Sequence, residues 1–138
     1  MKKSILLFAI LGLALSCSSD DDAGVGQFEA FNLKAYTPNP FFDPDTTVNY
    51  NDGDIVWDFN FSSNQVEVTI TEGIEPVRLS PGMYNFTLND NVCNYADNKY
   101  FHVADDVIGL LILDNYSEGS ITISDACIDG PIYVFERD

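Results

Sequence analysis

Residues 54–71 read DIVWDFNFSSNQVEVTIT. Every second side chain is apolar in both halves of this stretch, and the polar residues Ser62-Ser63-Asn64 separate the two halves. A repeat of two is typical of a β-strand that buries one face, and a short polar connection between two such strands predicts a hairpin. The stretch therefore predicts antiparallel β-structure, with Trp57 and Phe59 on the same face.

The same alternation continues through the rest of the chain, and no segment keeps a helical period. Turn residues stand between the runs, as at Pro81-Gly82 and Asp129-Gly130-Pro131. One run, residues 107–113, is apolar on both faces, which predicts a strand that is covered on both sides or lines a closed barrel. The further segments that predict strands are 28–36, 84–88, 101–103, 107–113, 120–124 and 132–137.

About eight or nine short strands with regularly spaced turns predict an all-β fold, either a β-sandwich or an up-and-down barrel. An immunoglobulin-type sandwich places a tryptophan between its two bridged cysteines, whereas Trp57 precedes both Cys93 and Cys127. Successive hairpins favour a meander, and a meander of about eight strands closes readily into a barrel. We therefore expect a single antiparallel barrel, with the β-sandwich as the alternative.

The N-terminus carries export signals. Two lysines, an apolar run over 5–15 and the small residue Ser16 are typical of a secretory signal, and the run is too short to span a bilayer. Residues 13–17 (LALSC) resemble the bacterial lipobox, in which the cysteine is acylated. We expect a lipoprotein signal peptide over 1–16, lipidation of Cys17, an acidic flexible tether over 17–26 and the barrel domain over 27–138. A plain secretory signal cleaved near Ser16 is the alternative.

Residues 18–22 (SSDDD) resemble the acidic export tags of Bacteroidetes surface lipoproteins. The resemblance implies a lipid-anchored outer-membrane protein at the cell surface, with a periplasm-facing anchor as the alternative. Without residues 1–16, four basic residues stand against 22 acidic ones, a net charge of −18. Such a chain repels nucleic acid and anionic lipid, so the anchor itself has to supply membrane affinity. Its candidate partners are cations, neutral glycans, apolar ligands and basic proteins; the alternative, which we favour, is that the acidity only keeps a surface protein soluble.

If Cys17 is acylated, Cys93 and Cys127 are the remaining thiols, and an exported chain favours a disulfide between them. The bridge closes a ring that the chain-entropy model values at about 4 kcal/mol. A zinc site formed by both cysteines and His102 is the alternative, but the spacing typical of zinc ligands is absent. His102 falls on the polar face of its strand, and no catalytic motif is recognisable. We therefore expect no cofactor, no metal and no enzymatic activity.

The connection over 37–53 is long for a hairpin, and loops of this length are often lids or binding loops. It contains the aromatic residues Phe41, Phe42 and Tyr50 among several aspartates. In a barrel this loop either lies across the open mouth or plugs the barrel end with its aromatic side chains. Counted from Asp43, the carboxylates do not follow the EF-hand pattern, which leaves only a loose calcium site open.

The chain also resembles the small lipocalin-like lipoproteins of Bacteroidetes over roughly residues 54 to 137. The segments that carry the resemblance are Trp57-Asp58-Phe59, Pro81-Gly82-Met83-Tyr84-Asn85-Phe86, Leu111-Ile112-Leu113-Asp114 and Tyr133-Val134-Phe135-Glu136-Arg137. The resemblance implies a barrel and an anchor, and it carries over no catalytic residue.

Three functions are compatible with these features. The first is a binding module for a small apolar or glycan ligand, lined by Trp57, Phe59, Tyr84, Phe86 and Tyr133. The second is an accessory protein of surface machinery, which contacts a surface protein partner through the long loop and the acidic exterior. The third is a calcium-dependent adhesive domain.

Overall fold

In the computed structural model, the described residues are 27–90, 99–104, 106–124 and 130–137. These residues form nine strands and two short 3-10 helices, and they contain no α-helix. The strands are β1 (Glu29–Thr37), β2 (Val48–Asn49), β3 (Ile55–Asn60), β4 (Gln65–Ile70), β5 (Gly82–Asp90), β6 (Lys99–Val103), β7 (Asp106–Ile112), β8 (Ser120–Ser124) and β9 (Ile132–Glu136). The 3-10 helices are η1 (Pro44–Thr46) and η2 (Tyr116–Glu118).

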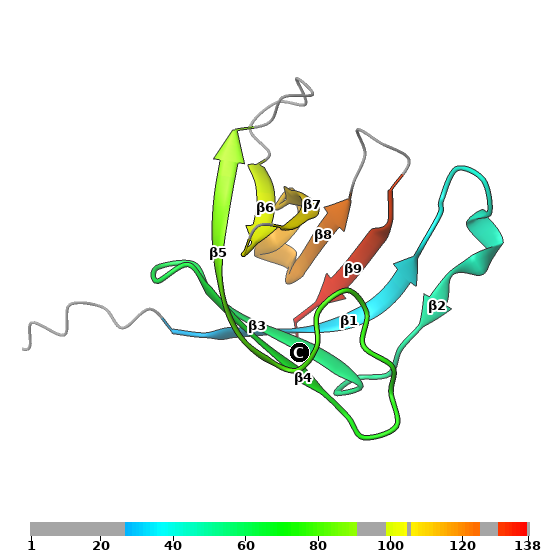
Figure 1. The fold of residues 1–138 in the computed structure, drawn as a ribbon, viewed down its shortest axis with the longest axis horizontal. Helices are drawn as coiled ribbons and strands as arrows, with labels where there is room; N and C mark the ends of the chain where they lie inside the picture. The colour runs from blue at the N-terminus through cyan, green and yellow to red at the C-terminus, as the bar shows by residue number, and fades with distance from the viewer. Residues whose placement is uncertain (1–26, 91–98, 105, 125–129, 138) are drawn as a thin grey trace, which may run out of the picture.

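Eight of the strands form a closed antiparallel barrel (Figure 1). From β3 to β9 each strand pairs with its neighbour in the chain, and β1 pairs with β3 on one edge and with β9 on the other. The closing ladder places Leu33 opposite Phe135 and Tyr36 opposite Tyr133. The ninth strand, β2, pairs only with the end of β1, through Ala35 and Tyr36. The predicted up-and-down barrel is thus confirmed, and the sandwich alternative is not.

The hairpin predicted from residues 54–71 is present as β3 and β4. Trp57 pairs with Val68 and Phe59 with Val66, and all four side chains are buried. The turn is stabilised by its own polar residues, because Asn60 Oδ1 accepts hydrogen bonds from the backbone N–H groups of Ser62 and Ser63 at 3.1 and 3.0 Å.

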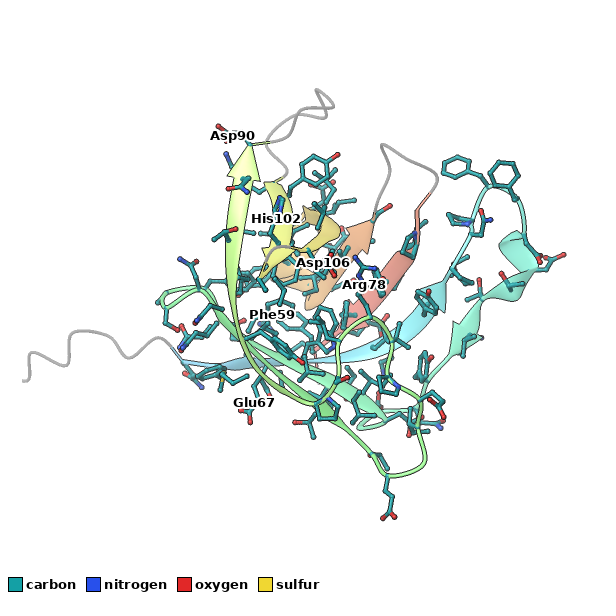
Figure 2. All side chains as sticks on the ribbon, in the orientation of Figure 1. Phe59, Glu67, Arg78, Asp90, His102 and Asp106 are labelled. Atoms are coloured by element: carbon teal, nitrogen blue, oxygen red, sulfur yellow. The ribbon has the colours of Figure 1, made fainter. Side chains whose placement is uncertain are left out.

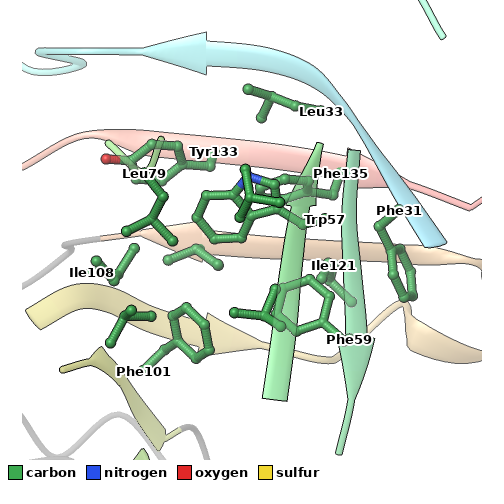
Figure 3. Close-up of a cluster of buried hydrophobic side chains, with 14 of the residues drawn as sticks. Phe31, Leu33, Trp57, Phe59, Leu79, Phe101, Ile108, Ile121, Tyr133 and Phe135 are labelled. Carbon is green, nitrogen blue, oxygen red and sulfur yellow. The ribbon is translucent and has the colours of Figure 1, made fainter. Parts of the chain in front are cut away.

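Aromatic side chains fill the centre of the barrel, and Phe59 lies in the middle of them (Figure 3). Its ring contacts those of Phe101 and Phe135 at centroid distances of 5.8 and 6.5 Å, and Trp57 lies 5.0 Å from Phe135. Edge-to-face and tilted arrangements of this kind add to the free energy gained by burying the rings.

The middle of strand β7 is buried on both faces, as residues 107–113 predicted, whereas Val107 and Leu113 at the two ends of that run are exposed. Leu111 faces the barrel core, whereas Leu110 is buried on the other face beside Tyr100 and Ser124. The strand carries an irregularity where it pairs with β6, and Gly109 lies there with φ +152°. A Cβ at this position would approach Ile123 Cγ2 to 2.9 Å, so the close approach of β7 to the neighbouring strand β8 requires glycine.

One end of the barrel, here called the base, is closed by an ion pair and aromatic rings. Glu29 Oε2 accepts hydrogen bonds from Tyr116 Oη at 2.6 Å and from Arg137 Nη2 at 2.7 Å. The Arg137 guanidinium also lies 5.1 Å from the ring centre of Phe31 and 5.0 Å from that of Tyr116. Burial, followed by the hydrogen bond to Glu29, raises the pKa of Tyr116. The first and last strands are thereby tied together.

Candidate functional site

The residues predicted to line a ligand site lie together in the barrel core. Trp57, Phe59, Phe86 and Tyr133 are buried, and Tyr84 is partly buried against them. They contact one another rather than standing apart, since Phe59 lies 6.3 Å from Phe86 and Trp57 lies 6.4 Å from Tyr133 between ring centres. A ligand that entered among them would have to displace side chains.

One polar atom in this core lacks a partner. Trp57 is 1 % exposed, and its indole Nε1–H reaches no hydrogen-bond acceptor in the described part of the chain. A buried donor without an acceptor costs about 1–3 kcal/mol. Natural cores keep few such groups, so this one is a candidate contact for a ligand oxygen.

The end of the barrel opposite the base is crossed by the β4–β5 connection, residues 71–81, here called the strap. Its apolar residues Val77 and Leu79 are buried, and Leu79 points into the same cluster as Trp57 and Tyr133 (Figure 3). Val77 and Leu79 flank Arg78 with the alternation of a strand, which is the sequence signal for their burial.

Arg78 holds the strap to the start of β7 (Figure 2). Its Nη2 donates to the Val107 carbonyl at 3.1 Å and lies 3.5 Å from Asp106 Oδ2. Arg78 has φ +67°, a conformation that non-glycine residues rarely adopt and that persists only where surrounding contacts enforce it. The strap, which joins β4 to β5, is therefore also tied to the start of β7.

The β1–β2 connection points away from the barrel (Figure 1). Phe41 is 66 % exposed and Phe42 is 77 % exposed, whereas Tyr50 is partly buried against the core. The expectation that the two phenylalanines plug the barrel end is therefore wrong. Tyr50 instead continues the β1 pairing by donating its N–H to the Lys34 carbonyl at 3.0 Å, and burial raises its pKa, with Tyr36 and Asp54 as further causes.

The two exposed phenylalanines sit on an ordered turn. The Asp43 N–H donates to the Asn39 carbonyl at 2.9 Å, and Thr46 Oγ1 donates to the Asp43 carbonyl at 2.7 Å. Thr37 and Thr47 share a hydrogen bond between their Oγ1 atoms at 2.8 Å, which joins the two arms of the connection. We call residues 39–47 the hairpin tip. Local hydrogen bonds thus fix the position from which Phe41 and Phe42 project.

Each basic side chain in the described part of the chain is paired with a different carboxylate. Arg78 pairs with Asp106 and Arg137 with Glu29, at 3.5 and 2.7 Å. Lys34 pairs with Asp52 in the same way, and Lys99 with Asp90. The hydrogen bond from Lys99 lowers the pKa of Asp90. Because acidic residues greatly outnumber these four cations within the described ranges, most of the carboxylates there form no ion pair with a lysine or arginine.

One acidic pair lies face to face on the barrel wall. Asp58 on β3 pairs in register with Glu67 on β4. Burial raises the pKa of Asp58, and the charge of Glu67 raises it further. Like charges directly opposite one another on neighbouring strands destabilise a sheet.

The other positions considered in the sequence analysis are the possible zinc and calcium ligands, His102 and the three cysteines. Among the described residues, no group of three or more histidine, cysteine, aspartate or glutamate side chains can hold a metal ion. His102 is half-buried on β6, with its ring 6.3 Å from that of Tyr100. In the long connection, Asp54 Oδ2 already accepts hydrogen bonds from the N–H and Nδ2 of Asn51. Cys17, Cys93 and Cys127 lie outside the described residues.

The described helices are all too short or too polar to cross a membrane. Comparisons with protein-family models, with curated proteins and with solved structures found no match.

Proposed function

We propose that this protein is a lipid-anchored interaction module that binds a surface protein partner through the hairpin tip. The observation that carries the proposal is the exposure of Phe41 and Phe42 on a turn ordered by hydrogen bonds. Two adjacent aromatic rings in water forgo the burial free energy that they would gain in the core or against a partner. Aromatic side chains are also the residues that most often dominate protein interfaces.

The hydrogen-bonded turn favours a binding role for the two exposed phenylalanine rings over exposure without a function. A loop held in one conformation loses less entropy when it docks, so more of the contact free energy appears as affinity. The barrel supplies the support, because β2 pairs with the end of β1 and Tyr50 packs against the core. In this proposal the barrel is a rigid scaffold, and acylated Cys17 with the tether over 17–26 holds it at the outer membrane.

Photo-crosslinking tests the proposal. The full chain, expressed in its host with p-benzoylphenylalanine at position 42, should crosslink to one protein partner upon irradiation. A second chain with the probe at position 83 is the control, because Met83 is 52 % exposed on the outer face of β5. A specific adduct at position 42 alone supports the proposal. Equal adducts at both positions, or none at either, would contradict it.

A second candidate function is the binding of a small apolar ligand in the barrel beneath the strap. The unpaired Nε1 of Trp57 favours it, because a ligand with one hydrogen-bond acceptor would satisfy that donor. The aromatic core is already packed, so the ligand would have to replace Val77 and Leu79 of the strap. Native mass spectrometry of the mature protein tests this candidate. A bound small molecule that is lost in Trp57→Phe would support it, and a bare polypeptide mass would count against it.

A further inference from the structure

We infer that the partner of the hairpin tip is a basic protein whose apolar pocket is bordered by lysine or arginine side chains. This inference rests on the proposed function and identifies the chemistry of the partner. Its two components are the aromatic pair, which calls for an apolar pocket, and the carboxylates beside that pair, which call for cations at the edge of the pocket.

The carboxylates belong to Asp43 and Asp45, which follow Phe42 within three residues and are exposed. The four basic side chains of the described chain are paired elsewhere: Lys34, the nearest in sequence, contacts Asp52. The negative charge at the tip is therefore not neutralised by these residues. A partner that supplies cations gains attraction there, and complementary charges raise the rate of association as well as the affinity.

The same charge argues against two other occupants of the tip. A second copy of this chain would bring another strongly acidic surface towards Asp43 and Asp45, and like charges across an interface oppose association. An anionic lipid surface would repel the two aspartates beside the rings in the same way. A basic protein is the occupant that meets both the apolar and the acidic features.

The test uses the protein captured by the photo-reactive probe at position 42, purified and titrated with the mature full-length chain at about 50 mM and about 300 mM salt. Asp43→Asn/Asp45→Asn removes the charges and keeps the rings. Phe41→Ala/Phe42→Ala removes the rings and keeps the charges. Asp114→Asn/Glu118→Gln removes two exposed carboxylates near the base and is the matched control.

We expect the asparagine variant to bind roughly tenfold more weakly at low salt and to lose most of its salt dependence, because charges at the edge of an interface act through screened attraction. We expect the alanine variant to bind at least about 30-fold more weakly at both salt concentrations, as is usual for aromatic hot spots. The control variant should bind within about twofold of the wild type. Because the tip is exposed, all three variants should keep the wild-type melting temperature within a few degrees.

The outcomes separate this inference from the function on which it rests. A captured partner whose binding depends on Phe41 and Phe42 but not on salt or on the two aspartates would overturn the inference and leave the proposed function intact. Adducts to lipid, adducts to a second copy of the chain, or the absence of any adduct at position 42 would overturn both.

Discussion

Arg137 Nη2 donates to Glu29 Oε2 at 2.7 Å, so that a residue beyond the last strand contacts the beginning of the first. The contact closes the base of the barrel together with the rings of Phe31 and Tyr116, which lie about 5 Å from the guanidinium. It joins the two ends of the described chain without a covalent link.

We expect Arg137→Ala to lower the free energy of unfolding by about 1–2 kcal/mol, because it removes the cation–π contacts and leaves Glu29 with one donor fewer. Both partners are more than a third exposed, and solvent screening keeps the ionic contribution small. Urea denaturation of the mature chain measures the loss. Asp114→Asn, an exposed change nearby, should leave the midpoint unchanged. Equal midpoints for Arg137→Ala and the wild type would show that the cluster does not hold the base.

Trp57→Phe should cost less than about 1 kcal/mol of stability, because phenylalanine keeps most of the ring contacts and removes an unpaired buried donor. Trp57→Ala should cost about 3–5 kcal/mol, because it leaves a cavity in the core. Chemical denaturation of both variants gives the comparison. If Trp57→Phe proved as damaging as Trp57→Ala, the indole N–H would have to make a stabilising contact.

Gly109→Ala should destabilise the barrel by about 2 kcal/mol or more, because its Cβ would come within 2.9 Å of Ile123 Cγ2. Gly73→Ala is the comparison for a positive φ without a contact, since Gly73 has φ +89° and no atom within 4 Å of its Cβ position, whereas Gly109 combines φ +152° with the contact. Thermal unfolding should show a clearly larger loss at position 109. Equal losses would mean that backbone conformation alone, rather than the contact with β8, requires the glycine.

Asp58→Asn should raise the free energy of unfolding at pH 7. Burial and then Glu67 raise the pKa of Asp58 in the folded protein above its ordinary value. The folded state therefore binds the proton more tightly than the unfolded state, and stability falls as the pH rises from the ordinary carboxyl pKa through the raised one. The advantage of the asparagine variant should thus disappear below that window. Glu72→Gln, an exposed change in the strap, is the control, and an advantage that persists at low pH would contradict this explanation.

Local sequence was sufficient for the eight strands of the barrel and insufficient for their connections, one of which contains the short strand β2. The alternation around Trp57 and Phe59 predicted both the hairpin and its buried face, and the apolar run over 107–113 predicted a strand buried on both sides. Alternation is a property of neighbouring residues, so it can be recognised without knowledge of the fold. The strap was missed because it is held by contacts with the start of β7, which is distant in sequence.

The hairpin tip is a second connection whose position the sequence did not predict. Phe41 and Phe42 were expected at the barrel end because phenylalanine is usually buried, whereas both side chains are exposed on a turn that points away from the barrel. Composition alone does not indicate to which side a loop folds. The predicted disulfide between Cys93 and Cys127 stays a prediction, since both residues lie outside the described part of the chain.

The adduct formed by a photo-reactive side chain at position 42 in the living host tests the central claim most directly. The interaction module predicts a single protein adduct whose yield falls to background when Phe41 is also replaced by alanine and when the probe is moved to position 83. A probe at position 42 that reacts only with water or with lipid, in cells that hold the chain at its normal level, would contradict it.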